Sequence, residues 1–148
     1  MTHAYSKLYL ESAQDILGQA FDWVTNTCNE DISLFCISFA KSRIASMFES
    51  GYPKYVAGCN GAELVNFVRE ELCLPEYAYP HEFYAHKSPE YWSGWAIAYF
   101  QWKSRIPFIR IFHKIPIEKV IALYPIGHEQ DIRNVADIFT DWMNVIQK

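Results

Sequence analysis

Two histidines and a glutamate lie close together in the stretch 74–88 (LPEYAYPHEFYAHKS). The imidazoles of His81 and His86, together with the carboxylate of Glu82, have the chemistry to bind a divalent metal or to share protons. However, an H-x4-H spacing in a proline-rich loop fixes no ligand geometry, whereas two histidines four apart on a helix share one face. We therefore predict solvated side chains here, with no bound metal and no cofactor.

A second acid-base group opens the final helical segment. His128, Glu129 and Asp131 could in principle cooperate in general acid-base catalysis. Acidic residues in a first helical turn also complement the helix dipole, which is a sufficient structural reason for Glu129 and Asp131. We favour the structural interpretation and assign no catalytic residue.

The motifs of nucleophilic and nucleotide chemistry are absent from the sequence. It contains no G-x-S-x-G, no G-x-x-x-x-G-K-[ST] and no G-x-G-x-x-G. None of the four cysteines stands two to four residues from another, so the paired spacing of a zinc knuckle is missing. With no secretory signal and no run of about 18 apolar residues, we expect reduced thiols and a cytoplasmic protein that does not cross a membrane.

Composition and periodicity predict an all-α fold. The chain has 148 residues, 51% hydrophobic and 20% charged, which fits one folded domain over residues 1–148. Apolar residues recur at helical spacing in most segments, one of which is expected to break near Lys41 and Ser42, and the stretches 51–61 and 74–88 are expected to be ordered loops. We predict about six or seven helices, within residues 6–27, 32–50, 61–73, 89–104, 107–113, 116–124 and 128–147.

The helix predicted over 89–104 is expected to be central. Ser88-Pro89-Glu90 supplies a cap, a proline at the first position and an acid in the first turn. Four rings then recur at spacings of three, four and three, so they share one face: Trp92, Trp95, Tyr99 and Trp102. Gly94 and Ala98 would let a neighbouring helix approach closely.

The high aromatic content, 17% of the chain, has two explanations. The rings of the central helix can fill the core, which is the interpretation we favour. Alternatively, part of that face stays accessible as a binding groove together with rings of the preceding loop, because aromatic residues dominate interface energies. The loop rings concerned are Tyr77, Tyr79, Phe83 and Tyr84.

Charge is distributed unevenly along the chain. The stretch 103–119 carries five basic residues and a single acid, Glu118, whereas the first 31 residues are dominated by acids. Either the basic helices dock on the acidic ones within the fold, or the basic surface binds a partner of opposite charge. The basic residues are Lys103, Arg105, Arg110, Lys114 and Lys119, and the acidic ones include Glu11, Asp15, Asp22, Glu30 and Asp31.

Two other functional classes remain open. A small enzyme or ligand-binding protein would need a pocket, for which Trp95, Tyr99 and His81 or His86 are the candidate lining residues. A DNA-binding regulator is suggested by the two short helices at 107–124, but the second has few polar residues to read base edges, and the net charge of −4 opposes non-specific nucleic-acid binding. Nucleic acid is therefore the less favoured partner.

Two longer motifs carry a family resemblance. Residues Pro53 to Leu64 read P-K-Y-V-A-G-x-x-G-x-E-L, and residues Ser88 to Trp102 read S-P-E-Y-W-x-G-W-x-x-A-Y-x-Q-W. Together they resemble an uncharacterised family of small bacterial proteins, and the similarity extends through the helix after His128. Phe100 stands where a tyrosine is common in that family, and residues 104–107 replace a more polar turn.

The resemblance implies a role in a small mobile operon. Members of that family are often encoded beside toxin-like proteins that resemble ADP-ribosyltransferases. This implies an antitoxin, immunity or accessory protein that binds its neighbour.

We therefore predict a non-catalytic protein-binding module whose partner is a protein, with the partner's identity and the oligomeric state left open. The predicted binding residues combine the aromatic face, the loop rings and the basic stretch: Tyr77, Tyr79, Phe83, Tyr84, Trp92, Trp95, Tyr99, Trp102, Lys103, Arg105, Arg110 and Lys114.

Overall fold

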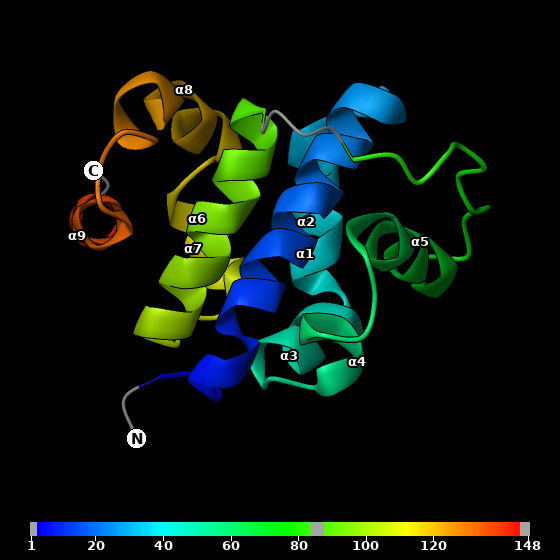
Figure 1. Ribbon diagram of the computed structural model, residues 1–148, viewed down its shortest axis with the longest axis horizontal. Helices are drawn as coiled ribbons and strands as arrows, with labels where there is room; N and C mark the ends of the chain where they lie inside the picture. Colours follow the sequence, from blue (N-terminus) through cyan, green and yellow to red (C-terminus); the bar gives the residue numbers. More distant parts are fainter. Residues whose placement is uncertain (1–2, 84–87, 146–148) are drawn as a thin grey trace.

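The computed structural model describes residues 3–83 and 88–145, and over these residues the chain is helical, with nine α-helices and no strand (Figure 1). The predicted all-α class is confirmed. A 3-10 turn (η1, Lys7–Tyr9) precedes α1, and a π-helical turn (η2, Trp23–Thr27) follows it. The α-helices are α1 Leu10–Asp22, α2 Ile32–Lys41, α3 Arg43–Glu49, α4 Pro53–Val56, α5 Gly61–Glu71, α6 Pro89–Ser104, α7 Phe108–Lys114, α8 Ile117–Gly127 and α9 Ile132–Met143.

The described residues contain more helices than the six or seven predicted. The predicted break near Lys41 and Ser42 is confirmed: Ser42 has an extended backbone, and its hydroxyl donates to the carbonyl of Phe39 and accepts from the N–H of Ala45. The stretch 51–61 is not entirely a loop, because Pro53 begins the single turn of α4. A proline at the first helical position costs no hydrogen bond, since that N–H would be unpaired in any case.

Helix α8 ends later than predicted. It was expected to stop at residue 124, before Pro125 and Gly127, but it continues to Gly127 and includes the proline. A proline near the C-terminal end removes one backbone hydrogen bond, and the remaining turn is held by packing. Gly127 is buried against the ring of Trp92, where a Cβ atom would lie 2.8 Å from the ring.

Side-chain caps fix the starts of several helices at the residues that the sequence indicates. Asp31 accepts from Ser33 N at α2, and Ser88 Oγ accepts from Tyr91 N at α6. Asn60 and Glu63 form a reciprocal capping box at α5. Each cap pairs backbone N–H groups that the helix itself leaves free.

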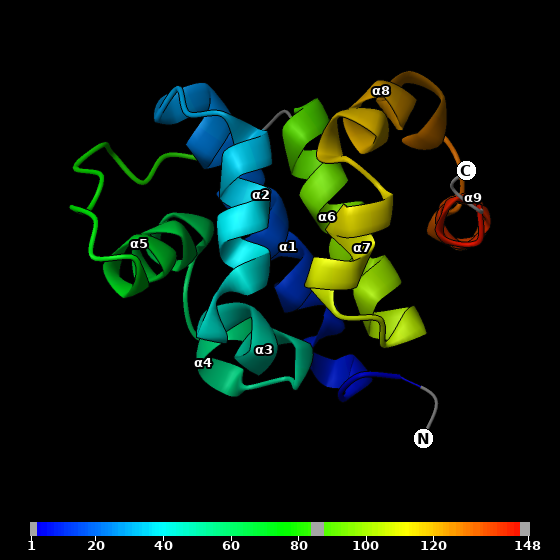
Figure 2. The same ribbon diagram turned by 180° about the vertical axis from the view of Figure 1, so that it is seen from behind.

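Helices α1 and α6 form the centre of the molecule and lie side by side in Figure 1. The other helices surround this pair, with α2 and α5 on one side and α8 and α9 on the other (Figures 1 and 2). The predicted central position of the aromatic helix is therefore confirmed. Rings and aliphatic side chains together fill the interior, and the fully buried rings are Phe21, Trp23, Phe39, Phe48, Phe100, Phe108 and Phe139.

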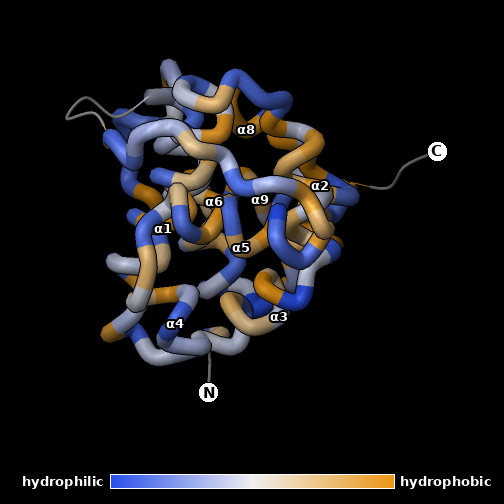
Figure 3. The backbone as a smooth tube through the Cα atoms, turned by 90° about the vertical axis from the view of Figure 1, so that its right-hand side faces the viewer, coloured by the Kyte–Doolittle hydropathy of each residue, from blue (hydrophilic) through white to orange (hydrophobic). Residues whose placement is uncertain are grey.

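Along the backbone, hydrophobic and hydrophilic residues alternate in short runs, as helices with one side against a core require (Figure 3). No helix in the described ranges is both long and apolar enough to cross a membrane.

Candidate partner-binding surface around α2

The predicted aromatic face of α6 is divided between the interior and the surface. Trp92 and Trp102 are buried, whereas Trp95 and Tyr99 are half-buried. The Trp102 indole donates from Nε1 to the carbonyl of Tyr5 at 2.8 Å. Trp92 and Trp102 were predicted as binding residues and are instead part of the packed core, because distant segments of the chain cover both ends of the face.

The predicted loop rings have different environments. Tyr79 is 47% exposed, Phe83 is half-buried, and Tyr84 lies outside the described residues, as does His86. Tyr77 is fixed in place: its hydroxyl donates to Glu30 and its N–H donates to Asn66 Oδ1 at 2.9 Å. Burial, with a smaller contribution from the Glu30 hydrogen bond, raises the pKa of Tyr77 to about 12.

Two further contacts hold this loop. The Arg69 guanidinium lies 3.8 Å from the centre of the Tyr77 ring, a cation-π arrangement, and its Nε donates to the carbonyl of Pro75. The buried indole of Trp23 donates from Nε1 to the carbonyl of Pro80 at 2.8 Å. The loop is therefore attached to the helices through Tyr77 and through the carbonyls of Pro75 and Pro80, while Tyr79 remains accessible.

The pocket predicted for an enzyme or ligand-binding protein is not assembled by the described residues. Trp95 borders an open hollow between α1 and α6 with Asp15 and Tyr91, while His81 borders a separate hollow with Tyr77 and Tyr79. Tyr99 borders neither. No group of three His, Cys, Asp or Glu residues in the described ranges could hold a metal ion.

The four cysteines are free thiols. Cys28 and Cys36 are buried, Cys59 is half-buried and Cys73 is exposed. Burial raises the pKa of Cys28 and of Cys59 to about 11, so these thiols stay protonated at neutral pH and are poor nucleophiles.

The basic residues predicted from the stretch 103–119 lie in three different places. Lys103 and Arg105 lie at the C-terminal end of α6, where Arg105 has a left-handed backbone with φ 62°. Arg110 and Lys114 lie on α7, and Lys119 of α8 stands over the ring of Trp142 at 4.3 Å. These residues are thus divided among the C-terminal end of α6, α7 and α8.

No salt bridge in the part of the chain that the structure describes joins the basic stretch to the acids of the first 31 residues. The one salt bridge in that part joins Arg133 to Asp131 within α9 and its cap. The acids of the first 31 residues are instead hydrogen-bonded to neutral groups: Asp15 accepts from Tyr91, and Asp22 accepts from Ser88 and Asn26. Arg110 and Lys114 of α7 therefore have no salt-bridge partner among the described residues.

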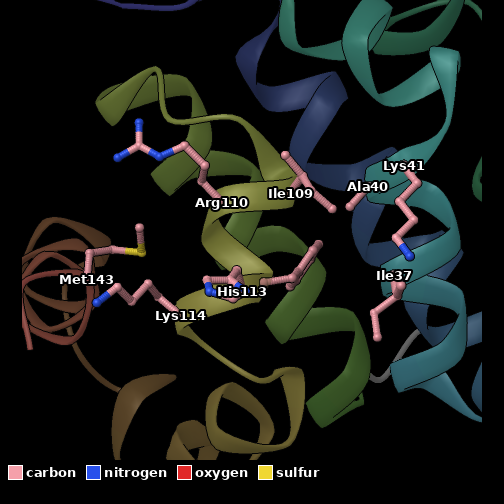
Figure 4. A pocket seen from close by; sticks show the side chains of 9 residues that line it. Ile37, Ala40, Lys41, Ile109, Arg110, His113, Lys114 and Met143 are labelled. Carbon is pink, nitrogen blue, oxygen red and sulfur yellow. The ribbon is translucent and has the colours of Figure 1, made fainter. Parts of the chain in front are cut away.

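A groove between α2 and α7 is lined by some of these basic residues (Figure 4). It has a volume of about 530 Å³. Its apolar part includes Ile37 and Ile109, which are 45% and 42% exposed. Its cationic groups are those of Lys41 on α2 and of Arg110 and Lys114 on α7. The His113 imidazole also lines the groove, and Met143 of α9 stands at one end.

The burial of one face of α7 explains why these side chains point outward. Phe108, Ile111 and Ile115 are fully buried and anchor one face of the helix. Residues 109, 110 and 113 then lie on the opposite face, where they remain exposed. The helix start is fixed by Glu49, whose carboxylate accepts from Phe108 N at 2.7 Å.

A second hollow, of about 230 Å³, lies on the other side of α2, between α2 and α5. Leu34, Leu72 and Leu74 border it and are strongly exposed, and Tyr77 closes one side. Figure 2 shows α2 in front, between α5 and α7, so the two hollows flank one helix. We call the five exposed apolar residues around these hollows the α2 face: Leu34, Ile37, Leu72, Leu74 and Ile109.

Helix α2 was not predicted from the sequence to be part of the candidate site, although the residues of this helix indicate an exposed apolar side. The stripe Ile32, Phe35, Phe39 identifies the inner side of α2, but Leu34 and Ile37 are apolar residues three apart that fall outside it. An amphipathic surface helix normally carries polar residues there.

Comparison with protein-family models, with curated proteins and with solved structures found no match to this chain.

Proposed function

We propose that this protein is a non-catalytic protein-binding module that holds a protein partner against the α2 face. The observation that carries the proposal is the concentration of exposed leucine and isoleucine around two adjoining hollows. Single exposed apolar residues are ordinary on a protein surface, whereas a contiguous apolar surface marks an interaction site.

The loop rings predicted from sequence fit this proposal in part. Tyr77 borders the α2–α5 hollow together with Leu34, and Tyr79 lies beside Tyr77 with ring centres 5.9 Å apart. Arg110 and Lys114 supply polar anchors at the other hollow. A partner on α2 would thus meet an apolar centre with aromatic and cationic groups at its edges, the composition typical of protein interfaces.

The biological role that we propose is that of a bacterial cytoplasmic antitoxin, immunity or accessory protein. Support comes from the resemblance of residues 53–64 and 88–102 to the family described above, whose members are encoded beside toxin-like proteins. The partner is then the toxin-like protein encoded next to this one, and binding would cover the surface it needs for its activity.

Site-specific photocross-linking in the producing cells tests the proposal. A photoreactive amino acid at Ile37 should yield one dominant cross-linked protein, identified by mass spectrometry, whereas the same group at Leu8, which is 91% exposed and outside the α2 face, should not. The purified pair should then form a complex that Ile37→Lys disrupts. Equal cross-linking from both positions, or none from Ile37, would contradict the proposal.

A growth assay tests the antitoxin role separately. If the cross-linked protein is the toxin-like neighbour, its expression should arrest growth, and co-expression of the wild-type chain should restore it. Co-expression of the Ile37→Lys variant should not. Complex formation without any effect on growth would retain the binding function and reject neutralisation.

A further inference from the structure

The α2–α7 groove has a charge of one sign along an apolar base. Lys41 comes from α2 and Arg110 from α7, and both are exposed. None of the lining residues in the described part of the chain is an Asp or Glu. Glu49, at the end of α3, points its carboxylate at Phe108 N at the start of α7 and is half-buried.

The cationic groups have no anionic partner within the described residues. The single salt bridge there belongs to Asp131 and Arg133, outside the groove. Lys114 donates from Nζ to the carbonyl of Val145 at 2.9 Å, a neutral acceptor. A surface field of one sign attracts groups of the opposite sign and speeds their association, so the groove is complementary to carboxylates.

We infer that the α2–α7 groove binds an acidic amphipathic helix of the partner protein, whose apolar side covers Ile37 and Ile109 and whose carboxylates meet Lys41, Arg110 and Lys114. The inference rests on the proposed function and specifies the chemistry of the partner. A helix laid between two helices presents apolar residues three, four and seven positions apart, with polar residues left at the edges.

The shape of the groove favours a helix over a small anionic lipid. Small-molecule sites bury about 70–90% of their ligand, but Ile37 and Ile109 are open to solvent and the apolar surface continues across α2 through Leu34. An elongated partner can cover both hollows, whereas a single acyl chain would leave most of this surface exposed.

Selection from a displayed peptide library tests the inference directly. The library would hold helical peptides of about 14 residues, or about 21 Å, with apolar residues at fixed helical spacing and all other positions random. The full chain serves as bait. Enriched peptides should carry a net negative charge, and their affinity should fall as salt rises, because salt screens exposed charges. Enrichment of neutral or basic peptides would overturn the inference.

Matched variants locate the binding. The double variant Arg110→Glu, Lys114→Glu should bind the selected peptides at least about tenfold more weakly, while Lys7→Glu, Lys54→Glu, with the same change in net charge on exposed residues elsewhere, should bind them as the wild type does. Circular dichroism checks each fold. If the charge reversal prevents folding, Arg110→Gln, Lys114→Gln makes the same comparison. Equal weakening by both pairs would overturn the inference.

The outcomes separate this inference from the proposed function. If the enriched peptides show no acidic bias but bind the Ile37→Ser variant more weakly than the wild type, the acidic helix is rejected and protein binding at the α2 face is retained. Failure of both the selection and the Ile37 cross-link would reject both. Saturable binding of dodecanoate that is lost in Ile109→Ser, with no peptide enriched, would assign the groove to an anionic lipid and overturn the inference.

Discussion

Gly94 of α6 lies directly against the backbone of Leu17 on α1, so that a Cβ atom at position 94 would stand 2.4 Å from the Leu17 carbonyl oxygen. Gly18, the next residue on α1, faces Tyr91 in the same way, one turn earlier on α6. The two glycines let the central helices approach at backbone distance.

Replacing Gly94 by alanine should destabilise the protein by about 2 kcal/mol, because the added methyl group must push the two central helices apart. Helix propensity alone predicts the opposite, a gain of about 1 kcal/mol. The free energy of unfolding of Gly94→Ala, measured in urea, shows whether the variant is less or more stable than the wild type. Gly58→Ala is the control, since a Cβ there would meet backbone atoms only at 3.1 Å and needs a small local shift.

The Trp23 indole should hold the loop that carries Tyr77 and Tyr79. Trp23→Phe keeps a ring in the core but removes the bond from Nε1 to the Pro80 carbonyl, at a cost of about 1 kcal/mol. Amide exchange and proteolysis should accelerate in residues 74–83. Trp102→Phe removes a comparable bond to Tyr5 and serves as the control. Unchanged exchange in the loop would show that the indole does not secure it.

Asp131 should make the stability of the folded protein depend on pH in the acidic range. Its carboxylate accepts from the backbone and side chain of Arg133, which lowers its pKa from 3.8 to about 2. A lowered folded pKa means that the carboxylate contributes stability above pH 3.8 and loses it as pH falls toward about 2. The melting temperatures of the wild type and of Asp131→Asn should therefore converge as pH falls from 3.8 to about 2, since asparagine caps a helix without titrating. A constant difference would contradict the assignment.

Glu49 should show the opposite dependence on pH. Burial raises its pKa above 4.5, more than the Phe108 hydrogen bond lowers it. The folded protein therefore holds this proton more tightly than the unfolded chain, and stability declines as pH rises from 4.5 through the raised value. Glu49→Gln keeps an acceptor for Phe108 N and should be at least as stable as wild type at pH 7.

A second variant at position 49 tests whether Glu49 stabilises the protein as a hydrogen-bond acceptor for Phe108 N. Glu49→Leu leaves the Phe108 N–H unpaired in a buried position, which should cost about 2 kcal/mol. Urea unfolding at pH 7 measures both variants. A Gln variant as unstable as the Leu variant would show that the charge, and not the acceptor, matters.

The α2 face should be dispensable for folding. Leu34→Ser and Ile37→Ser change residues that are 59% and 45% exposed, so the free energy of unfolding should stay within about 0.5 kcal/mol of wild type. Phe35→Ser, on the inner side of the same helix, should cost several times more. Large losses from Leu34→Ser would mean that this surface serves the fold and not a partner.

The sequence alone determined the helices and most of their boundaries, because these depend on interactions within about one turn. The caps at Asp31, Asn60 and Ser88 and the break at Ser42 are local hydrogen-bond choices, and they could be predicted. The one-turn helix α4 and the extension of α8 past Pro125 could not, since packing overrides the local signal there.

Only the tertiary structure decided which residues reach the surface. Trp92 and Trp102 share a helix face with Trp95 and Tyr99, yet the first two are buried by residues distant in sequence. Likewise, Arg110 became part of a groove because α7 packs beside Ile37 of α2, more than seventy positions earlier in the chain. Periodicity reports which side chains point the same way along one helix, but exposure is set by what the rest of the chain places against them.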